Sequence, residues 1–187
     1  MKVMQTSISG VIKIQPTVHL DPRGYFCVPF KSSNFQALGF PSNFVQDNQA
    51  QSTKGVLRGL HYQLKFPQGK LVWVSAGKVL DVAVDIRQNS PTFGLHESAI
   101  LDDENHTRFY IPPGFAHGYY VLSNTAIFQY KCTDTYHPED EYGVKWDDSG
   151  IGIPWGIGDK LVSEKDNLLS NLMDINPKLL PIFEEDI

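Results

Sequence analysis

The chain has 187 residues, of which 41% are hydrophobic and 20% are charged, and its formal net charge is −5. This length and balance predict one folded domain over residues 1–187 and exclude a disordered chain or two full-sized domains. The negative charge gives no overall attraction to nucleic acid, so an anionic ligand would need a local cluster of Lys and Arg.

Short strand-like runs separated by turns extend through most of the sequence. Apolar residues alternate with polar ones in several of them, and Gly, Pro, Asn and Asp mark the turns between them. In residues 79–86, for example, apolar residues alternate with Asp81 and Asp85, which is typical of a half-buried strand. The predicted strands cover residues 11–14, 25–30, 55–63, 71–74, 79–86, 108–111, 117–122 and 127–132.

Helical signals are few. Residues 32–38 are predicted to form an early helix, with Ser32 or Ser33 as its cap and Gly39 at its end. Residues 167–187 are richer in Leu and contain two prolines, and we interpret them as a short surface helix and a tail. The sequence therefore predicts an all-β fold, a double-sheet jelly roll closed into a small β-barrel with a few short helices.

Nothing in the sequence predicts export or insertion into a membrane. Polar residues interrupt the first nine positions too often for a signal-peptide core. The two cysteines, Cys27 and Cys132, are too few for a secreted disulfide scaffold and are expected to be free thiols. We therefore expect a cytoplasmic protein.

Residues 55–63 place charged groups inside an apolar strand. Burying Arg58 and His61 there costs free energy unless each side chain meets a partner or a ligand. The alternative is that Arg58 lies on the surface and that His61 is a core residue with its hydrogen bonds satisfied. Strict alternation would put the two on opposite faces of the strand. If both line one pocket, Gly59 marks a β-bulge.

Residues 112–118 read Pro-Pro-Gly-Phe-Ala-His-Gly, which resembles the second motif of the cupin superfamily. In many cupins the equivalent of His117 binds a metal together with a His-x-His pair and a Glu. Here His61 is followed by Gln63 where the second His would stand, and no carboxylate follows. These residues make a poor set of metal ligands, so no metal is expected.

Two further segments carry polar groups that could face the barrel interior. By alternation Phe128, Tyr130 and Cys132 share a face, which aims the Tyr130 phenol inward, although an interior Tyr is often only part of a core. Ser163 is a candidate helix cap, and Asp166 is expected to face inward.

These residue types fit proton transfer next to a ketone. Such chemistry needs a base, a group that stabilises the enolate oxygen, and an acid that returns a proton. A His backed by a carboxylate supplies the base, a Lys stabilises the enolate, and a phenol delivers a proton from the opposite face.

The ordered motifs resemble the dTDP-4-dehydrorhamnose 3,5-epimerases of the cupin superfamily. That family converts dTDP-4-keto-6-deoxyglucose into the 4-keto-rhamnose form on the way to dTDP-L-rhamnose. The order of so many matching segments makes the resemblance specific. They are residues 21–24, 44–48, 55–63, 70–72, 81–87, 90–94, 112–118, 130–138, 146–148 and 163–166.

The resemblance implies a role for each matching position and no cofactor. His61 is similar to the general base, Asp166 to its dyad partner, Tyr130 to the general acid, and Lys70 to the residue beside the C4 oxygen. The remaining positions are implied to contact the nucleotide sugar: Arg23, Phe26, Gln46, Asp47, Asn48, Arg58, His117, Tyr136, Glu141 and Lys165. In the family the first strands, with the equivalents of Arg23 and Phe26, reach the partner's site, so a homodimer is implied.

Two positions depart from the family pattern. Val28 stands where many members have a Glu that contacts the nucleotide, and Trp73 stands where many have Arg. The alternatives within enzymes are a 3-epimerase, an epimerase of another nucleotide 4-keto sugar, and a 3,4-ketoisomerase. The alternative outside enzymes is a non-catalytic module that binds a sugar nucleotide.

Overall fold

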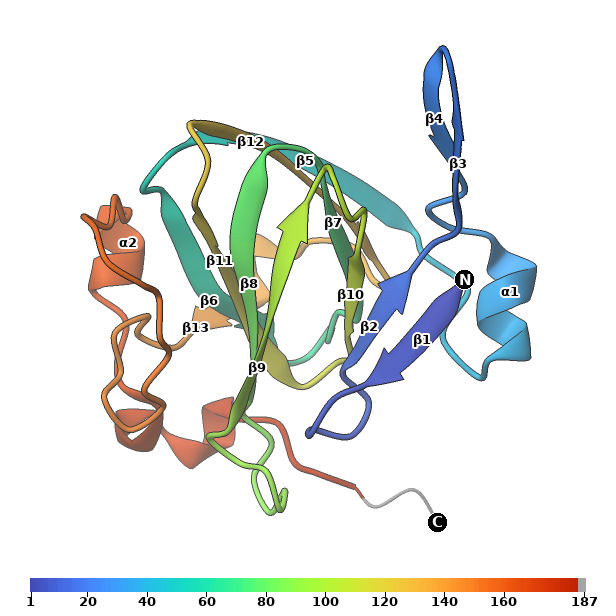
Figure 1. Cartoon of the computed structure of the whole chain (residues 1–187). Coiled ribbons are helices and arrows are strands. Elements are labelled where there is room, and N and C mark those ends of the chain that lie inside the picture. Colours follow the sequence, from blue (N-terminus) through green and yellow to red (C-terminus); the bar gives the residue numbers. More distant parts are fainter. Residues whose placement is uncertain (185–187) are drawn as a thin grey trace.

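The structure, a computed structural model, describes residues 1–184 and consists mainly of two facing antiparallel sheets (Figure 1). The six-stranded sheet has the order β1-β2-β10-β7-β12-β5, and the five-stranded sheet has the order β13-β6-β11-β8-β9. The predicted all-β, double-sheet architecture is thus confirmed. The strands are β1 (Lys2–Gln5), β2 (Ile12–Gln15), β3 (Val18–Asp21), β4 (Gly24–Cys27), β5 (Gln46–Thr53), β6 (Leu57–Gln63), β7 (Lys70–Ala76), β8 (Lys78–Asp85), β9 (His96–Asp102), β10 (Arg108–Ile111), β11 (Phe115–Val121), β12 (Thr125–Cys132) and β13 (Glu141–Gly143).

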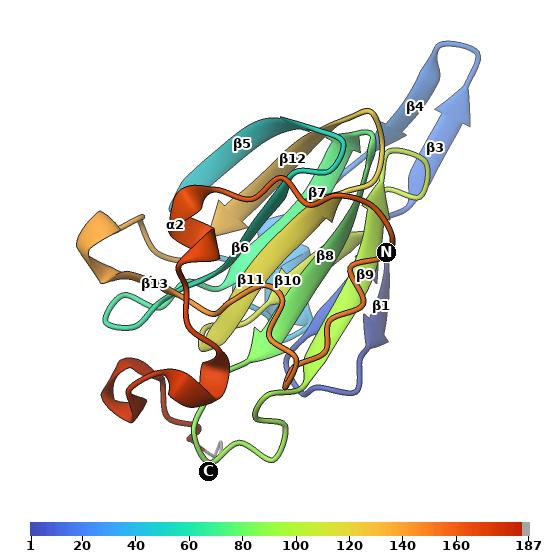
Figure 2. The same ribbon diagram turned by 90° about the vertical axis from the view of Figure 1, so that its left-hand side faces the viewer.

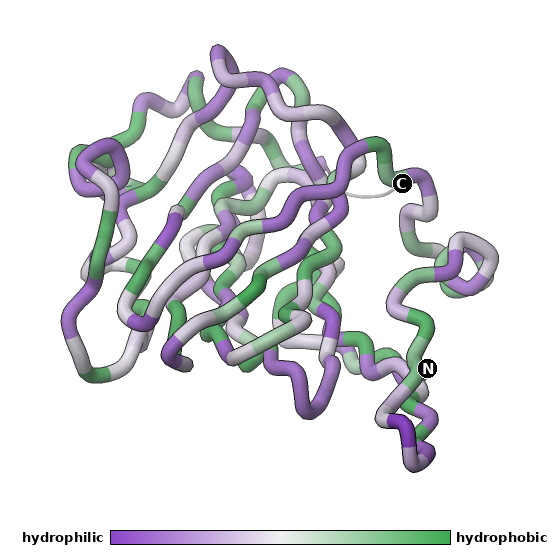
Figure 3. Tube along the Cα trace, turned by 90° about the horizontal axis from the view of Figure 1, so that it is seen from above, coloured by the Kyte–Doolittle hydropathy of each residue, from purple (hydrophilic) through white to green (hydrophobic). Residues whose placement is uncertain are grey.

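The space between the sheets is filled by an apolar core. Val72, Val74 and Phe128 enter it from the six-stranded sheet, and Leu101 and Phe115 enter it from the five-stranded sheet; all five side chains are buried. Figure 3 shows apolar and polar residues interspersed along the strands, as expected when successive side chains point to opposite faces. No helix within residues 1–184 is long and apolar enough to cross a membrane.

Strand β8 differs from the predicted half-buried strand, because both of its faces are covered. Val82 and Val84 pack outward under the C-terminal segment, which contributes Trp155 and Leu172 to the same cluster. The other face looks into the barrel, and there Asp81 is fully buried. The alternation of apolar and acidic residues therefore marks a strand that is buried on both sides and carries acids inside the protein.

The helices are short and lie outside the barrel. The predicted early helix is α1 (Ser32–Ala37), but its N-cap is Lys31 rather than a serine, and no side chain bonds the cap. Phe35 anchors α1 on the outer face of the six-stranded sheet. After α2 (Glu164–Asn167) come two 3-10 turns, η2 (Leu172–Asp174) and η3 (Pro177–Leu179), and a third, η1 (Pro138–Asp140), precedes β13. The last residues of the predicted tail, 185–187, lie outside the described residues.

Strands β3 and β4 form a hairpin that projects away from the barrel (Figures 1 and 2). Its apolar residues are exposed: Leu20 by 81%, Phe26 by 65% and Tyr25 by 53%. The Tyr25 ring, opposite Leu20 in the hairpin, contacts the His106 ring, with the centroids 4.2 Å apart. Exposed apolar side chains on a projecting hairpin are unusual for a monomer and suggest a protein partner.

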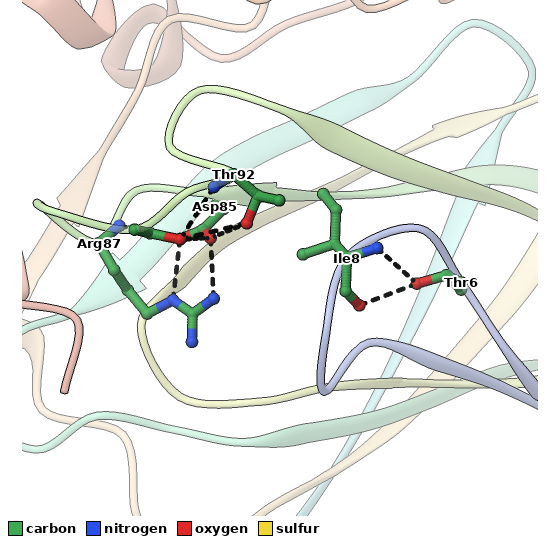
Figure 4. A network of polar contacts seen from close by, with 6 residues as sticks. Thr6, Ile8, Asp85, Arg87 and Thr92 are labelled. Atoms are coloured by element: carbon green, nitrogen blue, oxygen red, sulfur yellow. Dashed lines mark hydrogen bonds and ion pairs between the residues drawn. The ribbon is translucent and has the colours of Figure 1, made fainter. Parts of the chain in front are cut away.

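A buried carboxylate holds the end of β8 in place (Figure 4). The Asp85 carboxylate accepts hydrogen bonds from Arg87 Nε and Nη2 at 2.9 and 2.8 Å, and from the hydroxyls of Ser90 and Thr92 at 2.6 Å. Burial acts to raise the pKa of Asp85, but these bonds outweigh it and hold the pKa below the ordinary value of 3.8.

We expect Asp85→Asn to cost about 3–5 kcal/mol of the free energy of unfolding at pH 7, because it breaks a buried ion pair. The depressed folded-state pKa means that the stabilisation is present above 3.8 and is lost as the pH falls through the folded value. The difference in free energy of unfolding between the wild type and the variant, measured by urea unfolding, should therefore become smaller as the pH is lowered below 3.8. Asp147→Asn, at an exposed pair with Lys145, is the control and should change little. Equal stability of Asp85→Asn and the wild type at pH 7 would contradict this role.

Candidate active site

A cavity of about 680 Å³ opens between the two sheets. Strands β5, β7 and β12 of one sheet and β6, β11 and β13 of the other contribute to its walls, together with residues 161–166. All the residues predicted to form the site line this cavity except Arg23, Phe26 and Asp47. Those present are Gln46, Asn48, Arg58, His61, Lys70, His117, Tyr130, Tyr136, Glu141, Lys165 and Asp166.

His61 and Asp166 form the predicted dyad. The imidazole Nε2 of His61 lies 2.7 Å from Asp166 Oδ1, although the residues are 105 positions apart in the sequence. Helix α2 carries Asp166, and the Ser163 hydroxyl accepts the Asp166 N–H as the predicted cap. Burial acts to raise the pKa of Asp166, but His61, the Gly59 N–H and Ser163 together outweigh burial and hold the pKa below 3.8. The carboxyl is therefore ionised at neutral pH. A carboxylate can only accept, so the neutral His61 carries its proton on Nε2 and keeps a lone pair on Nδ1.

The predicted bulge at Gly59 is confirmed and explains how Arg58 and His61 line one cavity. In the pairing of β11 with β6, His117 faces His61 and Tyr119 faces Arg58, so β6 holds one extra residue. Gly59 has φ +110°, and a Cβ there would lie 2.6 Å from the carbonyl oxygen of His117. Only glycine fits this close approach between the strands.

His117 has a carboxylate partner of its own on the neighbouring strand. Its Nε2 lies 3.0 and 3.1 Å from the two carboxylate oxygens of Asp81, and both side chains are buried. Burial lowers the pKa of His117, and Asp81 only partly offsets this effect, so the ring is neutral at pH 7. The second cupin motif thus supplies a neutral imidazole to the cavity wall.

Gln63, at the position where cupins carry a metal-binding His, makes hydrogen bonds to the backbone of neighbouring loops. Gln63 donates to the carbonyl oxygens of Phe66 and Thr135 at 2.7 and 3.2 Å, and it accepts the His137 N–H at 2.9 Å. Within residues 1–184, no group of three or more His, Cys, Asp or Glu side chains is arranged to hold a metal ion.

Lys70 and Tyr130 enter the cavity from the sheet opposite His61. They lie on the neighbouring strands β7 and β12, and Tyr130 packs against the core between the sheets. Burial raises the pKa of Tyr130 to about 12, so the phenol is protonated at neutral pH. Burial lowers the pKa of Lys70, while Cys132, Asp81 and Glu141 act in the opposite direction. A ligand in the cavity thus lies between an imidazole and a phenol on opposite walls.

Polar residues from three segments meet at the mouth of the cavity. Glu141 accepts hydrogen bonds from Lys165 and from the Tyr136 hydroxyl, the latter at 3.2 Å. Burial acts to raise the pKa of Glu141, but Lys165, His61 and the Tyr136 hydroxyl together outweigh it and keep the side chain ionised. Gln46 accepts the Tyr136 N–H at 2.8 Å and donates to Asn48 at 2.9 Å. The exposed Tyr136 ring is available for stacking.

Three predicted residues lie outside the cavity of their own chain. Arg23 and Phe26 are on the projecting hairpin, where Arg23 pairs with Asp21 at 2.6 Å. Asp47 points to the opposite face of β5 from Gln46 and Asn48, and it pairs with Lys131 at 2.8 Å. The alternation of β5 therefore separates Asp47 from its neighbours.

The two departures from the family pattern also lie outside the cavity lining. Val28 is exposed just after the hairpin. Trp73 is on β7 next to Val72 and Val74, which point into the core, and it therefore faces outward. There its indole N–H donates to Gln129 at 2.9 Å, and its ring lies 5.3 Å from the Arg108 guanidinium.

Sequence reasoning missed two polar residues beside Arg58. Tyr119 lines the cavity, and Ser52 accepts hydrogen bonds from the Arg58 guanidinium at 3.3 and 3.4 Å. Alternation along the predicted strand 117–122 could have placed Tyr119 on the face of His117. Ser52 gave no such signal, because residues 46–53 are too polar to be predicted as a strand.

Comparison with known proteins agrees with this geometry. The family described as dTDP-4-dehydrorhamnose 3,5-epimerase matches residues 5–174. The enzyme of that name from Methanothermobacter thermautotrophicus is 50% identical over 168 residues, which cover 88% of this chain and 91% of that protein.

Solved structures give the same result. The dTDP-6-deoxy-D-glucose-3,5-epimerase RmlC of Legionella pneumophila, solved with dTDP-4-keto-L-rhamnose, aligns with a TM-score of 0.96 and 48% identity over 98% of both chains. ChmJ, a 3'-monoepimerase from Streptomyces bikiniensis solved with dTDP-quinovose, aligns with a TM-score of 0.89 and 34% identity, over 95% of this chain and 91% of ChmJ. A family match over most of the chain, together with half-identical relatives, shows that this chain belongs to the dTDP-4-dehydrorhamnose 3,5-epimerase family of isomerases.

Proposed function

We propose that this protein epimerises a dTDP-4-keto-6-deoxyhexose at both C3 and C5, converting dTDP-4-dehydro-6-deoxyglucose into dTDP-4-dehydrorhamnose. The observation that carries this proposal is that His61 and Tyr130 enter one cavity from opposite sheets. Inversion of a carbon next to a ketone requires removal of a proton on one face and delivery on the other. The product would serve rhamnose and polysaccharide synthesis in the cytoplasm.

The chemistry uses side chains alone. His61 Nδ1 takes the C3 proton, the C–H electron pair forms a C3–C4 double bond, and the C4 oxygen becomes an enolate beside the Lys70 ammonium. Tyr130 then protonates C3 from the opposite face, and the enolate returns to the C4 ketone. The His61 imidazolium gives its proton to solvent and the Tyr130 phenolate regains one, and the same steps repeat at C5 after the sugar ring has shifted. No step needs a metal or an organic cofactor. The nucleotide would be held by Arg58, Gln46 and Asn48, with Tyr136 stacked on thymine, His117 beside the sugar, and Glu141 and Lys165 at the mouth.

The function is tested by NMR of the substrate in D2O containing EDTA. We expect solvent deuterium at both C3 and C5 with both centres inverted, and no loss of rate on chelation. The relative ChmJ is a 3'-monoepimerase, so deuterium at C3 alone would reassign this chain to that activity. Exchange at neither carbon, with dTDP still bound, would leave only a binding module. Turnover that is lost with EDTA and restored by a divalent ion would contradict the cofactor-free mechanism.

We further propose a homodimer in which the β3–β4 hairpin of each copy completes the partner's cavity. Support comes from the exposure of Leu20 and Phe26 and from the position of Arg23 on the hairpin, outside its own cavity. Arg23 would then add a positive charge to the site of the second copy, where a diphosphate needs one.

The dimer is tested by subunit complementation. Arg23→Ala and His61→Asn should each be nearly inactive alone. After unfolding and refolding together, mixed dimers should regain activity, because one of their two sites contains both native residues. Arg23→Ala mixed with itself is the control. If mixing restores nothing although mass spectrometry shows mixed dimers, the hairpin does not serve the partner's site.

A further inference from the structure

The cavity wall contains a tyrosine hydroxyl that makes no hydrogen bond of normal geometry within residues 1–184. Tyr119 is 5% exposed, and its hydroxyl oxygen is buried without a hydrogen-bond partner within residues 1–184. Its ring is fixed by stacking on Phe128, with the centroids 4.0 Å apart. A buried unpaired hydroxyl lowers stability, and a phenylalanine would fill the same space without that cost. The hydroxyl therefore calls for an explanation beyond packing.

The surroundings of Tyr119 are those of an anion site. Tyr119 faces Arg58 across the β11–β6 pair, and Ser52 approaches from β5 on the other sheet. The Arg58 guanidinium donates to Ser52 Oγ from Nε at 3.4 Å and from Nη2 at 3.3 Å, both long for hydrogen bonds to a charged group. Burial raises the pKa of Tyr119, while the nearby Ser52 hydroxyl and the charge of Arg58 act in the opposite direction. Ser52 Oγ thus lies close to the Tyr119 hydroxyl but does not meet the geometry of a hydrogen bond with it.

We propose, resting on the function proposed above, that Tyr119 is a positioning residue for the diphosphate of the substrate. Phosphate oxygens that accept from Arg58 replace its two long bonds to Ser52. Ser52 Oγ is then free to accept the Tyr119 O–H and to turn its own proton toward the phosphate. The unpaired hydroxyl of the free protein thus becomes bonded only when the diphosphate is present, and its pairing adds to ligand affinity.

The test is Tyr119→Phe, which keeps the ring and removes the oxygen. We expect the variant to be at least as thermally stable as the wild type, while its Kd for dTDP and its KM rise about 2- to 12-fold, the worth of one hydrogen bond. The kcat should stay within about twofold, since the hydroxyl does not touch the reacting carbons. Thymidine, titrated by NMR, should bind both proteins equally because it has no phosphate. Tyr120→Phe, one residue along β11 and packed in the outer cluster, is the matched control and should leave the Kd unchanged.

A second variant tests the linkage to Ser52. Ser52→Ala should raise the Kd for dTDP, and the double variant with Tyr119→Phe should bind little worse than Ser52→Ala alone. An unchanged dTDP affinity in Tyr119→Phe, an equal loss for thymidine, or additive effects in the double variant would overturn the proposal. Because dTDP binding needs no turnover, these results are independent of whether the wild type inverts C3 and C5.

Discussion

His61→Asn should reduce kcat at least ~100-fold, the usual lower limit for the loss of a general base. In the proposed mechanism the imidazole Nδ1 takes the proton from the substrate carbon, and an amide at the same place has no comparable basicity. The Kd for dTDP should change little, because the base acts on the sugar ring. His96→Asn, on β9 and outside the cavity, is the control and should keep full activity.

Asp166→Asn tests the other member of the dyad, because it keeps the His61 imidazole but changes which of its nitrogens carries the proton. Asp166 Oδ1 accepts the Nε2 proton of His61 at 2.7 Å and so leaves the lone pair on Nδ1. An amide that turns its NH2 toward Nε2 would favour the other tautomer, with the proton on Nδ1, and kcat should fall by about 10²- to 10⁴-fold. Solvent exchange at C3 and C5, followed by NMR, should slow with it. Near-normal exchange in both variants would remove the dyad from the mechanism.

Most of the central strands could be predicted from their apolar residues, but five strands were not: β1, β3, β5, β9 and β13. Strand β5 was missed because seven of its eight residues are polar, and its alternation is in exposure rather than in hydrophobicity. Gln46 and Asn48 point inward, but they line a cavity rather than a core, so packing does not select apolar side chains at these positions. Strand β5 is therefore a wall of the site, where binding determines the residues more than packing does.

Individual residues of the site could be predicted from local sequence patterns, but the contact between His61 and Asp166 could not. Alternation aimed Tyr130 into the barrel, and Gly59 indicated the bulge that brings Arg58 and His61 together. No local pattern linked His61 to Asp166 across 105 positions, and that link came only from the resemblance to the family. Long-range pairs of this kind depend on how α2 docks against β6, which is a property of the tertiary fold.

Tyr130→Phe should separate proton exchange from inversion. In the proposed mechanism, His61 removes a proton on one side of the sugar and Tyr130 returns one on the other, since they enter the cavity from opposite sheets. With a pKa of about 12 the phenol is fully protonated at pH 7 and remains a proton donor. In the variant, His61 can still remove a proton, exchange it with D2O and return deuterium to the same face. The substrate should therefore gain deuterium without inversion, at the centre that depends on the phenol.

The measurement is the ratio of inverted product to deuterium incorporated, obtained for C3 and C5 separately by NMR. We expect inversion to fall about 10²-fold or more at one centre at least, the scale for loss of a general acid, while exchange there falls much less. Tyr142→Phe is the matched control, because Tyr142 stacks on Tyr62 in the outer cluster and does not line the cavity. It should keep the wild-type ratio at both carbons. If Tyr130→Phe also keeps that ratio, the proton comes from another donor, and the opposing walls of the cavity do not determine the stereochemistry.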